Sequence, residues 1–242
     1  MSLNITEVLG RSEQGVTRPF ICRCDDGCIY FVKGLDSNRE SQVKEWVVAS
    51  LARELGLPIA PFALVYTDPA LARLSMCEGL GEGFAFGSKK IQVTEITYSN
   101  IKEVPLDLQL DVLAFDWWIK NQDRTLSENG GNPNLFWEPQ ENQLVVIDHN
   151  QAFDADFCSE DFVGYHVFKD KYRQLFEDIV TRGDYVQRFE KALLKWDIIC
   201  ATIPDSWYFL DEDMSVKANV NVNEMKQILE RVTGQNFWDM DE

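Results

Sequence analysis

The sequence is poor in histidine and in positive charge. It contains two histidines, and its 23 Lys and Arg residues are outnumbered by 40 Asp and Glu residues, which gives a formal net charge of −17. Two histidines far from any cysteine cluster argue against a histidine-based metal site or a catalytic triad, and no G-x-S-x-G segment is present. The negative charge repels nucleic-acid phosphates and anionic lipids, so we expect neither nucleic acid nor a membrane as a direct partner.

Long apolar runs and a basic leader are also missing. No stretch approaches about 18 uninterrupted apolar residues, the length that a membrane helix needs. Residues 1–15 lack a basic region followed by an apolar run, so we expect a cytoplasmic protein. In that compartment the six cysteines are expected to be reduced thiols.

Three of the cysteines lie close together in the sequence. Cys22, Cys24 and Cys28 could suggest a zinc site, but no second pair with matching spacing follows. The segment has a strand-turn-strand pattern, so we interpret the three residues as buried strand thiols. A metal-binding regulatory protein built on this cluster is the third hypothesis for function.

The length and composition indicate an enzyme-sized folded body. The chain has 242 residues, of which 45% are hydrophobic and 26% charged. It can form one large domain or two lobes that share a cleft. Residues 1–98 have the patterns of strands and one helix, and residues 99–242 those of a mainly helical region.

The first half contains a hairpin followed by a helix. Residues 19–33 form two β-rich runs around the turn Asp25-Asp26-Gly27. Ser37 and Glu40 have the spacing of a capping box, which predicts a helix that runs to about Glu54. The runs PFALVY and IQVTEI are predicted strands, separated by the turn-rich GLGEGFAFGSKK.

The second half begins with a helix that leads into a polar loop. Apolar residues at helical spacing in LDLQLDVLAFDWWIKNQ predict this helix, and the loop RTLSENGGNPN follows it. NLFWE and QLVVID are predicted strands. The remainder is predicted to be mainly helical, including DYVQRFEKALLKW and VNEMKQILERV.

The order of the polar residues indicates phosphoryl transfer. That chemistry needs a cation on the non-transferred phosphates, a carboxylate at the attacking hydroxyl and oxygen ligands for Mg²⁺. Lys33 ends a strand, Asp123 follows a helix, and Asp148 ends an apolar strand. Asn132 or Asn134 can supply a further oxygen ligand.

These segments resemble the HipA-like kinases, distant relatives of protein kinases and phosphatidylinositol kinases. The resemblance is carried by FDWWIKNQDRT, NPNLFW and LVVIDHNQAF, with further support from CDDGCIYFVKG and EWVVASLARELGLPIAP. It implies an α+β, two-lobed protein-kinase-like fold. Residues 1–98 would form an N-lobe with an antiparallel sheet and one helix, and residues 99–242 a mainly helical C-lobe. ATP would bind between the lobes.

The resemblance implies roles for two carboxylates and their neighbours. Asp123 would orient the acceptor hydroxyl and accept its proton, and Asp148 would chelate Mg²⁺ as the Asp-Phe-Gly aspartate does in protein kinases. His149 follows Asp148, so that motif is incomplete here. Arg124 is expected to brace the loop, and Asp116 to support it from behind.

The second metal ligand is an asparagine whose position has shifted. The family places it about five residues after the catalytic aspartate, and Glu128 stands there in this sequence. An insertion within LSENGG moves the matching residue to the NPN segment. We favour Asn132, with Asn134 second and Asn129 third.

The phosphate-binding side is assigned in the same way. Lys33 resembles the strand lysine that holds the α- and β-phosphates, and Glu45 the helix glutamate that orients it. Glu40 is the alternative, but it already has a capping role. A loop over the phosphates is expected at a set of four residues: Gly10, Ser12, Gly15 and Thr17.

The sequence therefore predicts an ATP-dependent kinase that uses Mg²⁺ or Mn²⁺. Its acceptor is a hydroxyl group on a protein Ser or Thr or on a small molecule, including a lipid headgroup. The alternative from another class is a catalytically weak, pseudokinase-like nucleotide-binding module of the toxin-antitoxin type.

Overall fold

The computed structural model describes residues 2–13, 18–211 and 213–239. The chain divides into two compact units, each assembled from separate stretches. The first comprises Met1–Trp46, Ala60–Gln92 and Ile203–Val220, and the second comprises Val47–Ile59, Val93–Thr202 and Asn221–Glu242. Neither unit coincides with residues 1–98 or 99–242.

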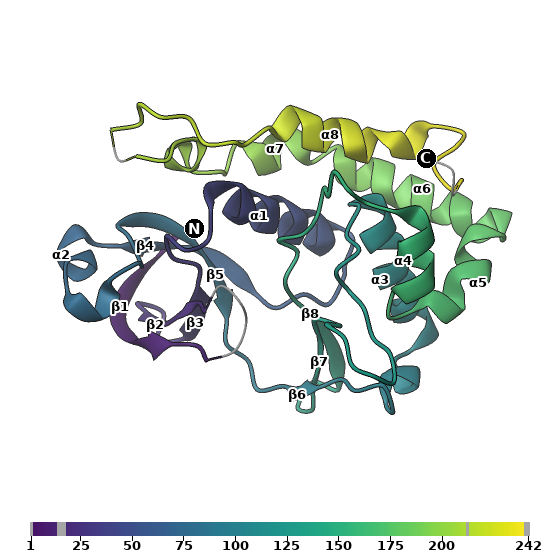
Figure 1. The fold of residues 1–242 in the computed structure, drawn as a ribbon, viewed down its shortest axis with the longest axis horizontal. Coiled ribbons are helices and arrows are strands. Elements are labelled where there is room, and N and C mark those ends of the chain that lie inside the picture. Colours follow the sequence, from purple (N-terminus) through teal and green to yellow (C-terminus); the bar gives the residue numbers. More distant parts are fainter. Residues whose placement is uncertain (1, 14–17, 212, 240–242) are drawn as a thin grey trace. The chain divides into compact units, whose positions relative to one another are not determined.

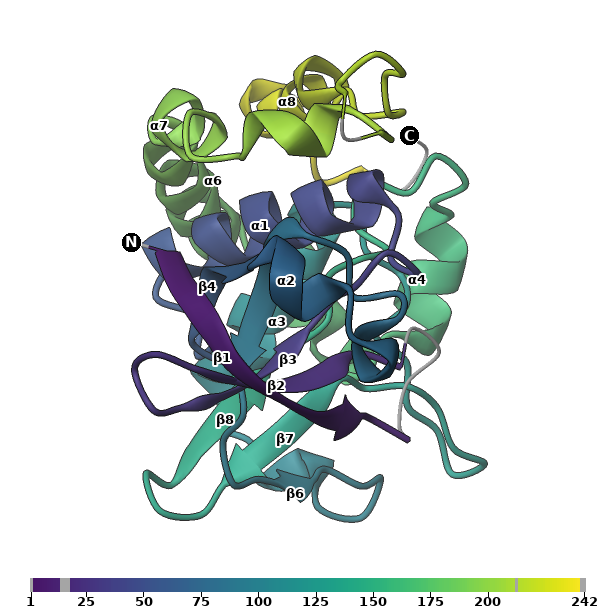
Figure 2. The same ribbon diagram turned by 90° about the vertical axis from the view of Figure 1, so that its left-hand side faces the viewer.

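The first unit is built on a closed five-stranded barrel (Figures 1 and 2). Its strands are β1 (Ser2–Arg11), β2 (Phe20–Cys24), β3 (Ile29–Val32), β4 (Phe62–Thr67) and β5 (Gly83–Lys89). Around the barrel the order is β1-β2-β3-β5-β4. β1 and β4 pair in parallel, with Leu3 opposite Val65, and the other pairs are antiparallel. The prediction of a purely antiparallel sheet is therefore wrong, because the parallel β1–β4 pair closes the barrel.

The hairpin predicted within residues 19–33 is present. Cys22 lies opposite Tyr30 in the β2–β3 pair. The turn depends on Gly27, whose φ of 79° is readily adopted only without a side chain. Turn chemistry and alternating apolar residues were enough to predict this element.

β5 lies in the segment predicted to be turn-rich, which corrects that prediction. Gly87 pairs with Ala63 within the β4–β5 ladder. A Cβ atom on Gly87 would lie 2.8 Å from Val65 Cγ1, so glycine permits a close approach of the two strands. The run IQVTEI contributes only the two-residue strand β6 (Thr94–Glu95).

The helix α1 spans Arg39–Glu54, close to its predicted bounds. Its N-cap is Asn38, whose Oδ1 accepts from the Ser41 N–H at 2.7 Å and whose carbonyl accepts from Gln42. Ser37, the predicted cap, is buried, and its Oγ has no hydrogen-bond partner among the described residues. The predicted capping box is wrong because Asn38 is one residue closer to the first free N–H groups.

Replacing Asn38 with Ala should lower the free energy of unfolding by about 1 kcal/mol, since the cap is lost. Ser37→Ala is the matched control and should have a smaller effect, because this hydroxyl makes no bond within the described structure. Thermal denaturation of both variants measures the difference. Equal losses in the two variants would contradict the assignment of Asn38 as the cap.

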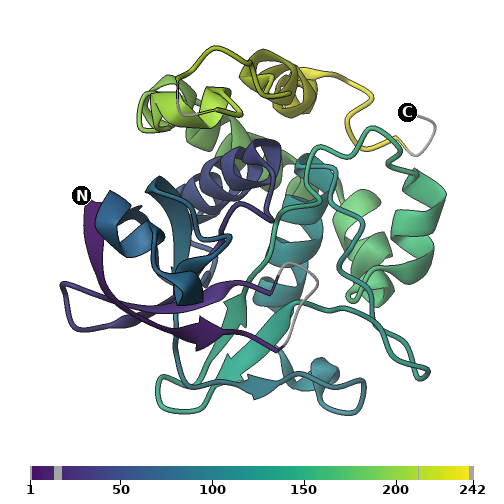
Figure 3. The same ribbon diagram turned by 60° about the vertical axis from the view of Figure 1, so that its left-hand side comes forward.

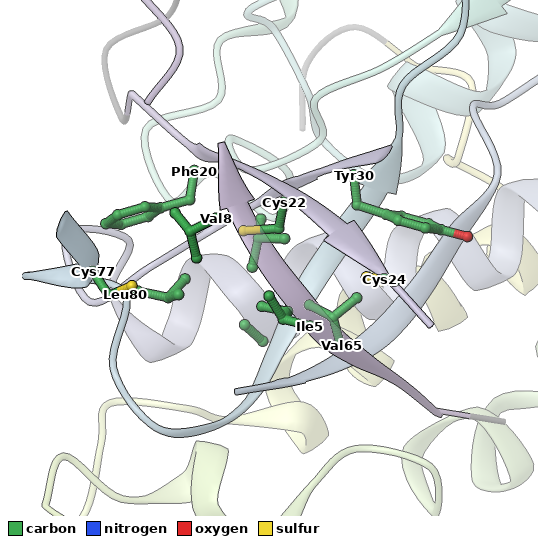
Figure 4. Packing of buried hydrophobic residues seen from close by; sticks show 11 residues of the cluster. Ile5, Val8, Phe20, Cys22, Cys24, Tyr30, Val65, Cys77 and Leu80 are labelled. Atoms are coloured by element: carbon green, nitrogen blue, oxygen red, sulfur yellow. The ribbon is translucent and has the colours of Figure 1, made fainter. Parts of the chain in front are cut away.

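The barrel encloses an apolar core that includes cysteines. Figure 4 shows this core, which includes Ile5, Val8, Phe20, Cys22, Cys24, Tyr30, Val65, Cys77 and Leu80. Cys22 and Cys77 are fully buried. The short helices α2 (Pro69–Ala72) and η1 (Ser75–Cys77) lie between β4 and β5 in the sequence.

A distant segment also belongs to the first unit. Residues 203–220 contain η4 (Asp205–Tyr208), and Trp207 is fully buried. The Trp207 indole N–H donates to the carbonyl oxygen of Phe84 in β5 at 2.8 Å. The late part of the chain therefore helps to complete the barrel unit.

The second unit combines a small sheet with helices. The sheet order is β6-β7-β8, with β7 (Leu135–Glu138) and β8 (Gln143–Val146) antiparallel as predicted. The α-helices are α3 (Leu106–Trp118), α4 (Ser159–Tyr165), α5 (Tyr172–Phe176), α6 (Ile179–Leu193), α7 (Trp196–Cys200) and α8 (Val222–Glu230). The 3₁₀ turns are η2 (Ile101–Glu103), η3 (Lys169–Lys171) and η5 (Arg231–Thr233).

Aromatic side chains hold α3 against the later helices, which lie beside it (Figures 1 and 3). Trp118 stacks on Phe189 of α6, with ring centroids 4.4 Å apart. Trp117 packs against Phe162 of α4, and its indole N–H donates to the carbonyl of Phe237. α3 is therefore fixed at the centre of this unit. Across the described residues, every helix is too short or too polar to cross a membrane.

Candidate active site

The loop after α3 carries Asp123. Lys120, at a φ of 50°, turns the chain out of the helix. The N–H of Thr125 then donates to the carbonyls of both Asp123, at 2.9 Å, and Asn132, at 3.2 Å. This shared bond brings Asn132 back beside Asp123, although nine positions separate them in the sequence.

The Asp123 carboxylate is the centre of a polar cluster. Its Oδ2 accepts hydrogen bonds from the Nδ2 groups of Asn132, at 2.9 Å, and Asn134, at 3.3 Å. Burial raises the pKa of Asp123, and the negative charge of Asp148 raises it further. The second effect acts only between nearby charges. The structure therefore brings Asp123, Asp148 and both candidate asparagines together.

Asp148 follows β8, as its apolar strand predicted. The preceding N–H, of Ile147, donates to the carbonyl oxygen of Asn134 at 3.1 Å. Asn134 and Asp148 therefore lie at the same end of the β7–β8 pair. Both have a left-handed backbone, with φ of 48° and 54°. This conformation costs roughly 1–2 kcal/mol for most residues, and Asn and Asp tolerate it best.

A buried ion pair lies behind this loop. Arg124 Nε donates to Asp116 Oδ2 at 2.7 Å, and both side chains are at most 1% exposed. Asn121 Nδ2 donates to Asp116 Oδ1 at 2.8 Å. The charge of Arg124 and a bond from His166 hold the pKa of Asp116 below its usual range, against the opposing effect of burial. Asp116 is therefore an ionised anchor for both ends of the Asn121–Arg124 segment.

The other side of Arg124 reaches the backbone near the polar cluster. Its Nη1 lies within hydrogen-bond distance of three carbonyl oxygens: Pro133 at 3.0 Å, Asn134 at 3.1 Å and Ile147 at 3.4 Å. Asn134 is one of these residues, and Ile147 directly precedes Asp148. One buried guanidinium therefore links the loop after α3 to both strand ends.

The first unit contains the ion pair predicted for Lys33. Lys33 Nζ lies 2.5 Å from Glu45 Oε1, and the two side chains are 11% and 3% exposed. Glu40, the alternative partner, pairs instead with Lys44 on the same helix at 3.0 Å. The backbone N–H of Lys33 donates to Phe86 of β5, which fixes the start of its side chain.

A family profile described as HipA-like kinase matches residues 5–241. The chain belongs to the HipA-like kinase family. Membership of this family identifies the protein as a kinase. No curated protein matches its sequence significantly.

Solved kinase structures show a distant similarity to this HipA-like kinase. The proinflammatory kinase CtkA of Helicobacter pylori aligns with a TM-score of 0.48 and 10% identity, over 99% of this chain and 94% of its own. The Golgi casein kinase with Mn/ADP bound aligns with a TM-score of 0.49 and 12% identity, over 99% and 74%. A second structure of the Golgi casein kinase gives a TM-score of 0.49 and 12% identity, over 95% and 70%.

The phosphate-covering loop predicted for this HipA-like kinase is described only at its start. Gly10, at a φ of 145°, follows an irregularity in the β1–β2 pairing. The Ser12 N–H donates to the carbonyl of Pro19 at 2.8 Å. Gly15 and Thr17 lie outside the described residues. The described part is therefore the base of the loop, where the chain leaves and rejoins the barrel.

Four cysteines of this HipA-like kinase, Cys22, Cys24, Cys28 and Cys77, lie in or beside the barrel core. Burial raises the pKa of Cys22 and of Cys24 to about 12, so both are neutral thiols. Within the described ranges, no group of three or more His, Cys, Asp or Glu side chains is arranged to hold a metal ion. The geometry favours the interpretation of Cys22 and Cys24 as buried strand thiols. That interpretation is wrong for Cys28, which is half-buried and directly precedes β3.

A cavity of about 170 Å³ lies beside the loop after α3 of this HipA-like kinase. Its lining residues are Thr125, Leu126, Ser127, Gly130, Tyr165 and Lys169. Ser127 and Gly130 form an isolated bridge within residues 126–131, which lie between Asp123 and the two asparagines. Residues 126–131 therefore form one wall of this cavity.

Two residues of this site were not predicted. Neither Asn121 nor His166 has a sequence pattern that assigns it to this site. His166 lies 3.0 Å from Asp116, which is 50 residues earlier in the sequence. The available signal was a single histidine within the aromatic run FVGYHVF, which indicates a buried polar contact but not its partner.

Proposed function

We propose that this kinase is ATP-dependent and transfers the γ-phosphate to a hydroxyl acceptor. The observation that carries the proposal is the pair of carboxylates, Asp123 and Asp148, held with two asparagines on a loop fixed by Arg124. Phosphoryl transfer depends mainly on positioning and charge stabilisation, for which such a rigid polar cluster is suited.

Asp123 is proposed to orient the acceptor hydroxyl and accept its proton. A general base works best when its pKa lies nearer the working pH than that of an ordinary carboxyl. Burial and the charge of Asp148 shift the pKa of Asp123 in this direction. The amide donors of Asn132 and Asn134 restrict the rotation of its carboxylate.

The cluster has the oxygen ligands that Mg²⁺ or Mn²⁺ requires. Both ions prefer oxygen ligands, and Asp148 offers a carboxylate beside amide side chains. The Nδ2 groups of both asparagines already donate to Asp123, so their Oδ1 atoms are the ones suited to a metal. When bound, the metal neutralises the charge that develops on the phosphates.

Of the two asparagines, Asn134 is proposed as the metal ligand, in place of our preference for Asn132 from sequence. The carbonyl of Asn134 is bonded to Ile147, which directly precedes Asp148, and Arg124 also holds it. Asn132 is exposed, and its carbonyl accepts from the Thr125 N–H and not from a residue next to Asp148. A fixed backbone next to Asp148 favours Asn134.

Lys33 is proposed to bind the non-transferred phosphates of ATP. An acidic chain with a net charge of −17 repels a nucleotide unless a local cation offsets the repulsion. Glu45 holds the ammonium of Lys33 in one place. The oriented cation costs little further ordering when ATP binds.

Mg·ATP should raise the melting temperature of this protein. At a nucleotide concentration about 100 times its Kd, the expected shift is roughly 5 to 10 °C. ATP with a chelator is the control and should give a much smaller shift, because the carboxylates then face the phosphates without a metal. No shift with millimolar ATP, with or without Mg²⁺, would contradict an ATP site. A shift without phosphate transfer to any acceptor would favour the nucleotide-binding module instead.

Removing the Lys33 charge should weaken Mg·ATP binding by about 10- to 100-fold, the loss expected for a hydrogen bond to a charged group. Lys33→Met alone leaves a carboxylate that is 3% exposed without its ammonium, which also destabilises the fold. The informative comparison is therefore Lys33→Met/Glu45→Gln against Glu45→Gln, measured by calorimetry. Lys44→Met, on the same helix, is the matched control and should bind like the parent. Equal affinity in the double and single variants would remove Lys33 from the site.

The acceptor is proposed to approach along the cavity beside Asp123. Thr125, in its wall, is bonded to the carbonyl of Asp123. The wall offers the ring of Tyr165 and the ammonium of Lys169, together with hydroxyl groups. These groups suit either a peptide side chain or a small polar molecule.

A further inference from the structure

His166 is a buried side chain to which no role has been assigned above. It directly follows α4 and is packed between Phe162 and Phe168. Its Nε2 lies 3.0 Å from Asp116 Oδ2, and its Nδ1 accepts from the Phe168 N–H at 3.1 Å. Both ring nitrogens therefore have partners within the second unit.

The two contacts determine where the ring carries its proton. A backbone N–H is always a donor, so Nδ1 must be the unprotonated nitrogen. Neutral His166 then carries its proton on Nε2, and this N–H donates a hydrogen bond to Asp116. Burial lowers the pKa of His166, although the contact with Asp116 acts in the opposite direction. The lowered pKa keeps the ring neutral near neutral pH.

Asp116 receives three donors, two from the loop after α3 and one from the segment after α4. Its Oδ2 accepts from His166 and from Arg124 Nε, and its Oδ1 accepts from Asn121. The terminal torsion of an aspartate is broad, so a carboxylate can rotate unless its bonds hold it. His166 is the one neutral donor on the oxygen that faces Arg124, and it restricts that rotation.

The orientation of Asp116 passes directly to Arg124. The guanidinium is planar, so Nε and Nη1 move together. Its Nη2 is buried and has no hydrogen-bond partner among the described residues. Asp116 on one side and the three carbonyls on the other therefore determine its position. The Val167 N–H also donates to the Arg124 carbonyl at 3.0 Å, which ties the His166 segment to the loop a second time.

We propose that His166 is a positioning residue for phosphate transfer. Its Nε2–H holds Asp116 in the rotation that directs Arg124 toward the backbone of Asn134 and Ile147. The arrangement of Asn134 and Asp148 then depends on a side chain that touches neither. This inference rests on the proposed kinase site.

Three variants of the full chain test the proposal. His166→Phe keeps an aromatic ring of similar volume and removes the donor to Asp116. His166→Gln keeps an amide donor and is the rescue variant. Phe162→Leu is the matched control, since Phe162 packs against the same ring at 4.8 Å but is not bonded to Asp116.

The first measurement follows the Arg124 Nε–H by NMR, with its signal identified by its loss in Arg124→Lys. In the parent it should be a single, slowly exchanging signal, because the group is buried and bonded to a carboxylate. His166→Phe should shift this signal and speed its exchange with solvent. His166→Gln should restore it in part, and Phe162→Leu should leave it in place.

The second measurement is the rate of γ-phosphate transfer, or of ATP turnover in water. His166→Phe should lower kcat by about 10- to 100-fold, as the loss of an outer partner of a metal site does, with little change in KM for ATP. Phe162→Leu should lower the melting temperature without this loss of kcat. His166→Gln should recover part of the rate.

The two measurements separate the possible failures. An Arg124 signal that is unchanged in both His166 variants overturns the proposal, whatever the activity. Equal losses of kcat in His166→Phe and Phe162→Leu also overturn it, since the effect is then one of stability. If the Arg124 signal follows His166 but the parent transfers no phosphate, the link through Asp116 holds and the proposed kinase function fails.

Discussion

Asp123→Asn is expected to lower phosphate transfer by about 10²- to 10⁴-fold while Mg·ATP affinity stays close to that of the parent, since the acceptor loses its base. Both asparagine donors bond to one oxygen of Asp123. The amide oxygen of the new Asn can occupy that position, so the loop should keep its shape. Calorimetry measures the affinity, and labelled γ-phosphate measures the transfer.

Asp148→Asn is the companion variant because it has the same size change at the other carboxylate. It should lose metal-dependent nucleotide binding as well as transfer, since the metal loses its charged ligand. Parental transfer by Asp123→Asn would contradict the assignment of the base. Identical defects in the two variants would show that both carboxylates act on the metal.

Arg124→Met should destabilise the fold by about 3 to 5 kcal/mol, because it leaves the Asp116 carboxylate buried without its charged partner. Asp116 is fully buried, so solvent cannot replace the guanidinium. The change also removes the donor to three backbone carbonyls. Denaturant unfolding with a parental reference measures the loss.

The double variant Asp116→Asn/Arg124→Met tests the cause of that loss. Removing the charge of Asp116 should recover part of the stability, since an amide is easier to bury than an unpaired carboxylate. Transfer activity should stay low, because the guanidinium bonds from Arg124 to the carbonyls of Asn134 and Ile147 are then missing. A double variant that is less stable than Arg124→Met would indicate that packing, and not the unpaired charge, dominates.

Elements defined by local chemistry were predicted well from the sequence. The hairpin followed from Gly27 and the alternating residues beside it, and α1 from its apolar stripe. The pairing of Lys33 with Glu45 was implied by the resemblance to the HipA-like kinases, and the structure contains it. In each case the decisive neighbours lie within about a dozen positions in the sequence.

Features that depend on distant neighbours were missed. β5 contains Gly83 and Gly87, which local propensity assigns to turns, and only the approach of Val65 explains Gly87 in a strand. The parallel pairing of β1 with β4 joins residues about sixty positions apart and closes the barrel. His166 has no local signal for its partner, Asp116. Such contacts depend on the tertiary fold, which overrides local preference.

Trp207 has a consequence for the order in which the protein folds during synthesis. Its indole bonds to Phe84, 123 positions earlier, and its ring is buried in the barrel unit. At a synthesis rate of about 5 to 20 residues per second, the barrel strands wait roughly 6 to 25 seconds for this side chain. During that interval Phe84 and its neighbours expose a surface on which nascent chains can associate. We therefore expect ribosome-bound chains that stop before residue 203 to recruit chaperones more strongly than chains that extend past residue 220.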